Sequence, residues 1–178
     1  MTTAMTGGGG VTLVLGGARS GKSRYAESLI TAQPQPWVYV ATAQVRDDEM
    51  AARIKEHKAR RAAGWQTIEA PHEVPEALNA APQGAAILVD CLTLWLSNLM
   101  HAKFDIDKMT VLLEQALAAR SGATVLVSNE VGLGIVPENA LGREFRDRQG
   151  VLNQRLAAVA DRVVFMIAGL PNVVKERP

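Results

Sequence analysis

One eight-residue segment constrains the fold and the chemistry of this chain more than any other. Residues 16–23 read Gly-Gly-Ala-Arg-Ser-Gly-Lys-Ser and fit the pattern G-x-x-x-x-G-K-[S/T] at every position. The apolar, β-branched residues 11–15 precede it, and the helix-compatible residues 22–30 follow it. A strand, a glycine-rich turn and a helix N-terminus place successive backbone N–H groups around a phosphate. The segment therefore predicts a phosphate-binding P-loop and a nucleoside triphosphate as ligand.

The residue types within this loop have separate expected roles. Glycine lets the backbone curl around the phosphates because it has no Cβ. We expect Lys22 to contact the β- and γ-phosphates and the Ser23 hydroxyl to bind Mg²⁺. The nucleotide-binding residues predicted from the motif are Gly16, Gly17, Ala18, Arg19, Ser20, Gly21, Lys22 and Ser23.

The length and charge of the chain limit what surrounds this loop. With 178 residues, 48% of them hydrophobic and 21% charged, the chain has the composition of a single soluble globular domain. We expect residues 11–178 to form that domain and residues 1–10 to be a flexible N-terminal extension. The net charge of +1 gives no electrostatic reason to expect nucleic acid or an anionic membrane as a partner.

Cysteine usage and hydropathy indicate a cellular compartment. Cys91 is the only cysteine, so no intrachain disulfide can form and a reducing environment is expected. No apolar run reaches the length of a membrane-spanning helix, and residues 1–6 lack the basic start of a secretory signal. These features predict a cytoplasmic location. Cys91 itself has two interpretations, a buried small hydrophobic residue or a catalytic thiol.

Strand-like and helix-like segments alternate along the rest of the chain. Four further strands are predicted, at residues 37–42, 85–90, 124–128 and 162–167. Helices are predicted at residues 47–63, 92–100, 107–119 and 143–160. Residues 70–84, which contain three prolines, form the least regular stretch. The alternation predicts a single-domain α/β P-loop NTPase fold of the RecA-like kind, with a mostly parallel central sheet and helices on both faces.

Polar residues follow several of these predicted strands. Ligands collect at the carboxyl ends of parallel strands, so residues 42–44, Asp90, Asn129 and Glu130 should border the phosphate loop. Asp90 is either a carboxylate that holds Mg²⁺ or an N-cap for the helix after it. Glu130 is either a base or metal-site residue or a solvated surface carboxylate. The loop at 131–137 places two glycines among branched apolar residues, which indicates a sharp turn or a close approach to a ligand.

The predicted helix at residues 47–63 carries one histidine of interest. Helical spacing places Met50, Ile54, His57 and Arg61 on a single face. His57 is therefore either packed at the edge of the core or held among cations that also bind phosphates. Nearby positive charge disfavours protonation and leaves a ring nitrogen free to attack phosphorus. The residues alone leave both interpretations open.

Four blocks of the chain, taken together, resemble one enzyme family. They are residues 16–24, 47–54, 129–139 and 151–157, and they occur in the family's order. The family is the bifunctional adenosylcobinamide kinase/adenosylcobinamide-phosphate guanylyltransferase of cobalamin biosynthesis. The resemblance extends from about residue 11 to residue 167.

This resemblance implies a two-step reaction. ATP or GTP first phosphorylates the aminopropanol arm of adenosylcobinamide. A histidine then takes GMP from GTP and passes it to adenosylcobinamide phosphate, which gives adenosylcobinamide-GDP. The family's histidine nucleophile falls on His57. Besides the P-loop, its nucleotide contacts fall on Ala41, Thr42, Ala43, Lys58, Ala59, Arg60, Arg61, Glu69 and Asp90.

The P-loop serine and the carboxylate at a strand end predict Mg²⁺ as cofactor, held by Ser23 and Asp90. The resemblance implies a homotrimer. The family often has glutamate at the position of Asp90, so the carboxylate here is shorter. Two other functions compete with this one. They are a P-loop kinase or NTPase for another small metabolite, with His57 structural, and a nucleotide-binding module without transfer chemistry.

Overall fold

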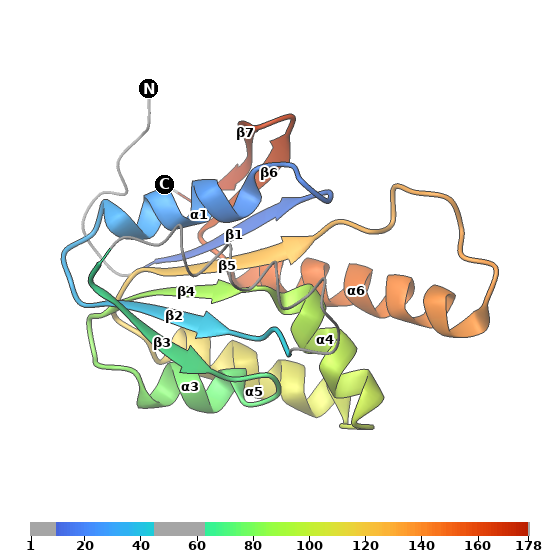
Figure 1. The fold of residues 1–178 in the computed structure, drawn as a ribbon, viewed down its shortest axis with the longest axis horizontal. Helices are drawn as coiled ribbons and strands as arrows, with labels where there is room; N and C mark the ends of the chain where they lie inside the picture. Colours follow the sequence, from blue (N-terminus) through green and yellow to red (C-terminus); the bar gives the residue numbers. More distant parts are fainter. Residues whose placement is uncertain (1–9, 45–62, 178) are drawn as a thin grey trace.

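The computed structural model describes residues 10–44 and 63–177. The expected N-terminal extension therefore lies outside the described residues except for Gly10, and so does nearly all of the helix expected at 47–63. Within the described ranges the chain forms one seven-stranded sheet with helices against both faces (Figure 1).

The strands are short and mostly apolar. In chain order they are β1 Val11–Gly16, β2 Trp37–Ala41, β3 Trp65–Glu69, β4 Ala86–Asp90, β5 Thr124–Asn129, β6 Arg162–Ile167 and β7 Leu170–Glu176. The central strands β4 and β5 are buried over nearly their whole length. Continuous apolar runs of this kind are typical of parallel strands that are covered on both faces.

The described helices are α1 Lys22–Thr31, α3 Val74–Ala80, α4 Leu92–His101, α5 Ile106–Ala118 and α6 Ala140–Val159. Side-chain caps fix two of their starts. The Asp105 carboxylate accepts a hydrogen bond from the backbone N–H of Lys108 at the start of α5. The Asn139 amide oxygen accepts one from the backbone N–H of Gly142 at the start of α6. Such caps satisfy N–H groups that the first helical turn leaves unpaired.

The strand order β3-β2-β4-β5-β1-β6-β7 places β1 in the interior of the sheet. All neighbouring strands pair in parallel except β6 and β7, which form an antiparallel hairpin. The predicted α/β fold with a mostly parallel sheet is therefore confirmed. Figure 1 shows that the parallel strands all end at the same edge of the sheet, where the P-loop follows β1.

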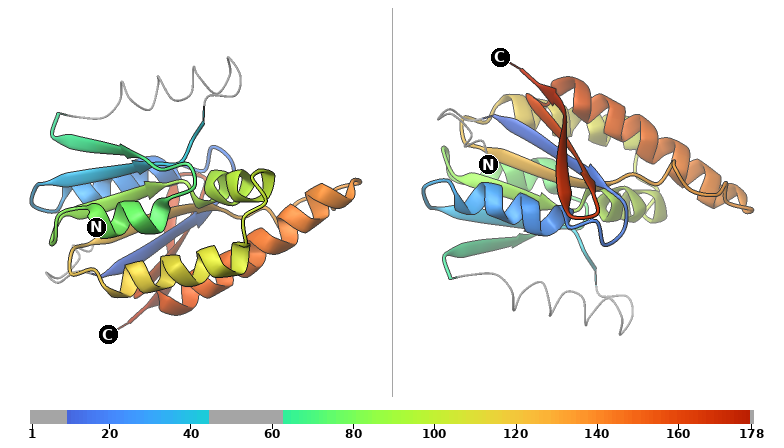
Figure 2. Two further views of the ribbon diagram at one scale, coloured as in Figure 1. Left: turned by 90° about the horizontal axis from the view of Figure 1, so that it is seen from below. Right: turned by 90° about the horizontal axis from the view of Figure 1, so that it is seen from above.

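Alternation along the strands divides the buried side chains between two faces. On one face, Val125 and Val127 of β5 pack with Leu29 and Ile30 of α1. On the other face, Leu126 packs with residues of α3, α4, α5 and α6. The two views of Figure 2 show α1 in front of one face and the other helices in front of the opposite one.

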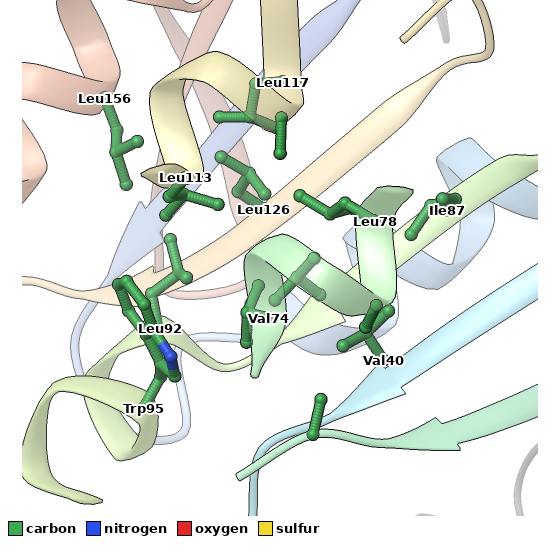
Figure 3. Close-up of a cluster of buried hydrophobic side chains, with 14 of the residues drawn as sticks. Val40, Val74, Leu78, Ile87, Leu92, Trp95, Leu113, Leu117, Leu126 and Leu156 are labelled. Carbon is green, nitrogen blue, oxygen red and sulfur yellow. The ribbon is translucent and has the colours of Figure 1, made fainter. Parts of the chain in front are cut away.

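The larger part of the core lies on the face covered by four helices. Figure 3 labels the side chains that meet there, which are Val40, Val74, Leu78, Ile87, Leu92, Trp95, Leu113, Leu117, Leu126 and Leu156. This core holds the strands of the sheet in place, and the candidate site residues lie at the carboxyl edge of the sheet. None of the described helices has both the length and the apolar composition that a membrane crossing requires.

Two elements differ from the sequence-based expectation in the first half of the chain. The segment at 70–84 contains α3, because Pro75 lies at the start of that helix, where the missing N–H of proline costs nothing. The edge strand β3 was not predicted. Only Trp65 and Ile68 are partly buried, and its other three residues are exposed, so its apolar signal is weak.

The last strand, β7, was not predicted either. Residues 168 and 169 join it to β6 in a two-residue turn in which Ala168 and Gly169 have φ values of 51° and 82°. Positive φ at both central residues is typical of the hairpin turns that match strand twist. Alanine is uncommon at such a position, and the exposed side chains of β7 show little alternation, so the sequence signal is weak.

We predict that truncating a core side chain of β5 destabilises the whole sheet. Leu126 has no exposed surface, so Leu126→Ala should lower the free energy of unfolding by about 2–5 kcal/mol through lost burial and a new cavity. Chemical denaturation measures this change. Val111→Ala is the matched control, because Val111 is 41% exposed and should cost well under 1 kcal/mol. Equal losses in the two variants would contradict the assignment of the core.

Candidate nucleotide site

The P-loop connects the end of β1 to the start of α1. Gly21 precedes the helix with φ of 90°, a left-handed conformation that favours glycine. The carbonyl of Gly21 accepts a hydrogen bond from the N–H of Tyr25 at 3.0 Å. Among residues 10–44 and 63–177, no side chain caps α1, and its first turn contains no acidic residue. The backbone N–H groups of this turn therefore point toward the loop, where an anion can accept their hydrogen bonds.

Neighbouring strands hold this loop in place. A Cβ on Gly16 would lie 2.6 Å from the Ser20 hydroxyl oxygen and 2.9 Å from the carbonyl oxygen of Met166, so only glycine fits there. The N–H of Glu130 donates to the Gly16 carbonyl at 3.2 Å, and the N–H of Gly169 donates to the Ser20 carbonyl at 3.0 Å. The loop is thus tied to the end of β5 on one side and to the β6–β7 turn on the other.

The lysine of the loop lies over its own backbone. The Lys22 ammonium donates a hydrogen bond to the Gly17 carbonyl oxygen at 2.9 Å. This contact keeps the positive charge beside the N-terminus of α1, whose dipole is also positive at that end. The two together make the loop a local concentration of positive potential, which favours a polyphosphate.

Strand alternation places several polar residues on the same face as α1. Tyr39 and Leu88 belong to the buried cluster of that face, so Ala41 and Asp90, two residues further along their strands, point the same way. Asn129 follows Val125 and Val127 in the same manner. Asp90 and Asn129 therefore lie at the carboxyl edge of the sheet, on the side of the helix that begins at the P-loop.

Asp90 is held by a buried tyrosine. The Tyr39 hydroxyl donates a hydrogen bond to Asp90 Oδ2 at 2.9 Å, and Tyr39 is only 4% exposed. The N-cap residue of α4 is Cys91, not Asp90, so the interpretation of Asp90 as a helix cap is wrong. One strand, β5, separates β4 from β1, so Asp90 lies about 10 Å across the sheet from the P-loop strand.

Thr42 has a structural role within the site. Its hydroxyl donates to the carbonyl oxygen of Cys91 and accepts from the N–H of Cys91, both at 2.8 Å. Its carbonyl oxygen accepts a hydrogen bond from the Asn98 side chain at 2.8 Å. These bonds join the chain after β2 to the chain after β4. The Thr42 side chain is fully buried and is committed to this junction.

The remaining predicted site residues are spread along the sheet edge. Glu69 ends β3, opposite Ala41 in the register, and three strands separate β3 from β1. At about 4.8 Å per strand, Glu69 lies about 19 Å from the P-loop strand. Ala43 follows β2 at the same edge of the sheet.

Glu130 bonds within its own loop, because its Oε1 accepts from the N–H of Gly132 at 2.6 Å. His57 and the neighbouring residues 58–61 lie outside the described residues. Sequence reasoning missed Tyr39 and Thr93, whose roles come from contacts with other strands and leave no local pattern.

Two cavities lie on other parts of the molecule. One, of about 250 Å³, is between α4 and α6 and includes Met100, His101 and Phe145 in its lining. The other, of about 240 Å³, is between α5 and α6. Neither is lined by a residue of the P-loop.

The comparisons with known proteins identify the family. A family model described as cobinamide kinase / cobinamide phosphate guanyltransferase (CobU) matches residues 12–174. The chain belongs to this family. The bifunctional adenosylcobalamin biosynthesis protein CobP of Pseudomonas aeruginosa is 46% identical over 171 residues, covering 93% of this chain and 98% of that protein. The CobU protein of Salmonella typhimurium is 46% identical over 180 residues, covering 92% and 98%.

Solved structures share the fold of this family member at low identity. The flagellar accessory protein FlaH of Methanocaldococcus jannaschii has a TM-score of 0.53 and 12% identity, covering 94% of this chain and 79% of that one. A protein of Pyrococcus horikoshii OT3 has a TM-score of 0.58 and 11% identity, covering 94% and 87%. At these identities the likeness concerns the fold alone.

We predict that the single cysteine is chemically inert at neutral pH. Burial, together with the nearby Asp90 carboxylate, raises the pKa of the Cys91 thiol from 9.0 to about 11. Alkylation by iodoacetamide requires the thiolate, so the folded protein should react at half its maximal rate only near pH 11. The unfolded protein should reach that point near pH 9.

The same shift makes the free energy of unfolding depend on pH. Because the folded pKa is raised, the contribution of Cys91 is fully present below pH 9 and is lost as the pH rises toward about 11. Cys91→Ser should remove both the alkylation and this pH dependence. Half-maximal alkylation of the folded protein below pH 9 would revive the catalytic-thiol interpretation.

Proposed function

We propose that this chain carries out both activities of its family. It phosphorylates adenosylcobinamide with ATP or GTP and then transfers GMP from GTP to adenosylcobinamide phosphate. The observation that carries the proposal is the family match over residues 12–174, joined to a P-loop at the uncapped start of α1. The relatives' names describe bifunctional proteins of adenosylcobalamin biosynthesis.

The kinase step relies on positioning and charge. In the proposed complex, the N–H groups of residues 16–23 bind the phosphates and Lys22 leaves the Gly17 carbonyl for the β- and γ-phosphates. The hydroxyl of adenosylcobinamide attacks the γ-phosphorus, and the nucleoside diphosphate departs. Asp90 is better placed than Glu130 to assist, because Tyr39 orients its carboxylate at the sheet edge while Glu130 bonds to Gly132.

A magnesium ion fits this arrangement. The described residues contain no group of three or more histidine, cysteine, aspartate or glutamate side chains that could hold a metal on their own. Mg²⁺ in nucleotide sites takes one or two protein ligands and completes its shell with phosphates and water. Ser23 at the start of α1 and Asp90 at the end of β4 would hold it. When bound, the ion neutralises charge on the phosphates.

The guanylyl step is assigned to His57. In the proposed reaction a ring nitrogen of His57 attacks the α-phosphorus of GTP, a P–N bond forms, and pyrophosphate leaves. The phosphate of adenosylcobinamide phosphate then attacks the same phosphorus and releases His57. Residues 58–61 supply cations that offset the phosphate charge. The assignment is supported by the family resemblance, and by Gln44, from which the chain enters residues 45–62 at the same sheet edge as the P-loop.

We propose further that the enzyme is a cytoplasmic homotrimer, as the family resemblance implies. The hairpin of β6 and β7 exposes apolar side chains, including Leu170 at 72% and Val174 at 64%, which favours self-association. Light scattering coupled to size exclusion measures the mass of the particle. A monomer at micromolar concentration would contradict this part of the proposal.

We predict that Lys22→Ala impairs both activities. The variant loses the charge that meets the β- and γ-phosphates, so the transition state should be destabilised by several kcal/mol, about 3 kcal/mol or more. Steady-state assays with adenosylcobinamide, and with its phosphate plus GTP, measure the two losses. Lys108→Ala on the exposed start of α5 is the matched control. Near-normal kinase turnover in folded Lys22→Ala would refute the P-loop assignment.

We predict that His57→Ala separates the two activities. The P-loop is unchanged, so phosphorylation of adenosylcobinamide should persist, while adenosylcobinamide-GDP should not form. Incubation with α-labelled GTP should label the wild type through an acid-labile, alkali-stable bond and leave the variant unlabelled. His101→Ala, at the exposed end of α4, should be labelled like the wild type. Uptake of label by His57→Ala would place the nucleophile elsewhere.

A further inference from the structure

The loop between β5 and α6 begins beside the P-loop. Asn129, the last residue of β5, lies opposite Gly16 in the parallel register, and the N–H of Glu130 donates to the Gly16 carbonyl at 3.2 Å. The N–H of Asn129 donates to the Thr93 hydroxyl oxygen at 2.8 Å. From this fixed base the chain runs outward, beyond the carboxyl edge of the sheet, to the start of α6 (Figure 1, Figure 2). The loop is therefore anchored next to the phosphate-binding segment.

Residues 131–137 of this loop have no polar side chain at all. Leu133 is 82% exposed, Ile135 is 97% exposed, and Val136 is more than half exposed. Leu141, in the first turn of α6, is also more than half exposed. Single exposed apolar residues are common, but four that are gathered in one loop and the helix turn after it are typical of a binding surface. We call these four residues the apolar patch.

Hydrogen bonds hold the loop that carries these side chains. Glu130 Oε1 accepts from the N–H of Gly132 at 2.6 Å. Arg143 Nη1 donates to the carbonyl oxygen of Pro137 at 3.0 Å. A Cβ on Gly142 would lie 2.9 Å from Pro137 Cβ, so the end of the loop packs closely on α6. A ligand therefore meets apolar side chains that are already arranged, which lowers the cost of binding.

The cavity of about 250 Å³ between α4 and α6 continues the apolar patch. Leu141 and Gly142 line it from the start of α6, and Met100 lines it from α4. Phe145 adds an aromatic ring from the next turn of α6. Because Leu141 belongs to both, the patch and the cavity form one apolar surface, which extends from the loop to the space between the two helices.

The proposed reaction requires a surface for the acceptor at this edge of the sheet. In the kinase step the acceptor hydroxyl must reach the γ-phosphate at the P-loop, so the body of the acceptor lies outside the carboxyl edge. Adenosylcobinamide is a large macrocycle that carries methyl groups and uncharged amides around its ring. Apolar side chains can bury those methyl groups, whereas a phosphate or a ribose requires polar side chains, which residues 131–137 lack.

We propose that the apolar patch and the cavity bind the corrin ring of adenosylcobinamide and so hold its aminopropanol hydroxyl at the P-loop. The inference rests on the proposed function and names the part of the chain that selects the acceptor. A second copy of the chain is the other occupant of suitable chemistry. The exposed side chains of Leu170 and Val174 in β7 already offer a surface for self-association, whereas the apolar patch follows β5, the strand that adjoins the P-loop strand.

Calorimetry with the full chain tests the proposal directly. Adenosylcobinamide is titrated into protein that is saturated with Mg²⁺ and AMP-PNP, a non-hydrolysable triphosphate that prevents turnover. Ile135→Ser and Leu133→Ser should each lower the affinity for adenosylcobinamide by about 10-fold, the worth of burying roughly half of an aliphatic side chain. The affinity for AMP-PNP should stay within about twofold of the wild type, because the P-loop is unchanged.

Val111→Ser is the matched control. Val111 is an exposed apolar residue of α5 that does not line the cavity, so both affinities should equal those of the wild type. In steady-state assays, Ile135→Ser and Leu133→Ser should raise KM for adenosylcobinamide with little change in kcat, as expected when a contact made equally in the ground and transition states is lost.

Two further measurements separate the corrinoid from other occupants. Light scattering coupled to size exclusion should give the same particle mass for the wild type and both variants. The Tm of the variants should not fall, because the side chains that are shortened are exposed. Unchanged affinity for adenosylcobinamide in both variants, an equal loss of affinity for AMP-PNP, or a fall in particle mass would overturn the proposal.

These outcomes are distinct from a failure of the proposed function. Wild-type protein that binds adenosylcobinamide without phosphorylating it, with weaker binding in both variants, would contradict the kinase assignment and support the corrinoid surface. Wild-type protein that phosphorylates adenosylcobinamide, with wild-type affinity in both variants, would overturn the surface alone. Absence of binding by the wild type would overturn both.

Discussion

The pairing of β1 with β5 is the interaction on which the site depends. It sets Gly16 opposite Asn129, and the N–H of Glu130 then reaches the Gly16 carbonyl. A shift of one residue in this register would turn the Asn129 side chain from the face of α1 to the opposite face of the sheet. It would also move the other side chains of β5 to the opposite faces. The buried side chains of β5 oppose such a slip, since they fill the cores on both faces. The packing of the core therefore also fixes the geometry of the phosphate loop.

Around this pairing the site is built from two kinds of residue. The glycines of the loop leave room for close backbone contacts, and its backbone N–H groups are the donors for the phosphates. Four side chains hold the other strand ends by hydrogen bonds to a carboxylate or to the backbone: Tyr39 in β2, Thr42 directly after β2, and Thr93 and Asn98 in α4. The loop can bind phosphate through its own fold, whereas the placement of Asp90 depends on contacts between strands.

The sequence predicted the parts of the fold that have strong local signals. The P-loop, the central strands and the long helices α5 and α6 follow from glycine spacing, apolar runs and helical periodicity. The edge strands β3 and β7 have mostly exposed residues, so pairing with a neighbour decides their structure and periodicity does not. The contact of Tyr39 with Asp90 joins residues that are far apart in sequence and could not be predicted from either segment. His57 stays a prediction from the family resemblance.

The hydrogen bond between the P-loop and the β6–β7 turn joins two segments that are far apart in the sequence. Gly169 donates to the Ser20 carbonyl, and its Cα would lie 3.3 Å from a Cβ placed on Gly21. The hairpin turn therefore packs against the P-loop and limits its conformation. A substitution in one of the two segments is expected to require a compensating substitution in the other. A directed-evolution library that varies the hairpin turn alone would sample altered nucleotide affinity without touching the phosphate-binding motif.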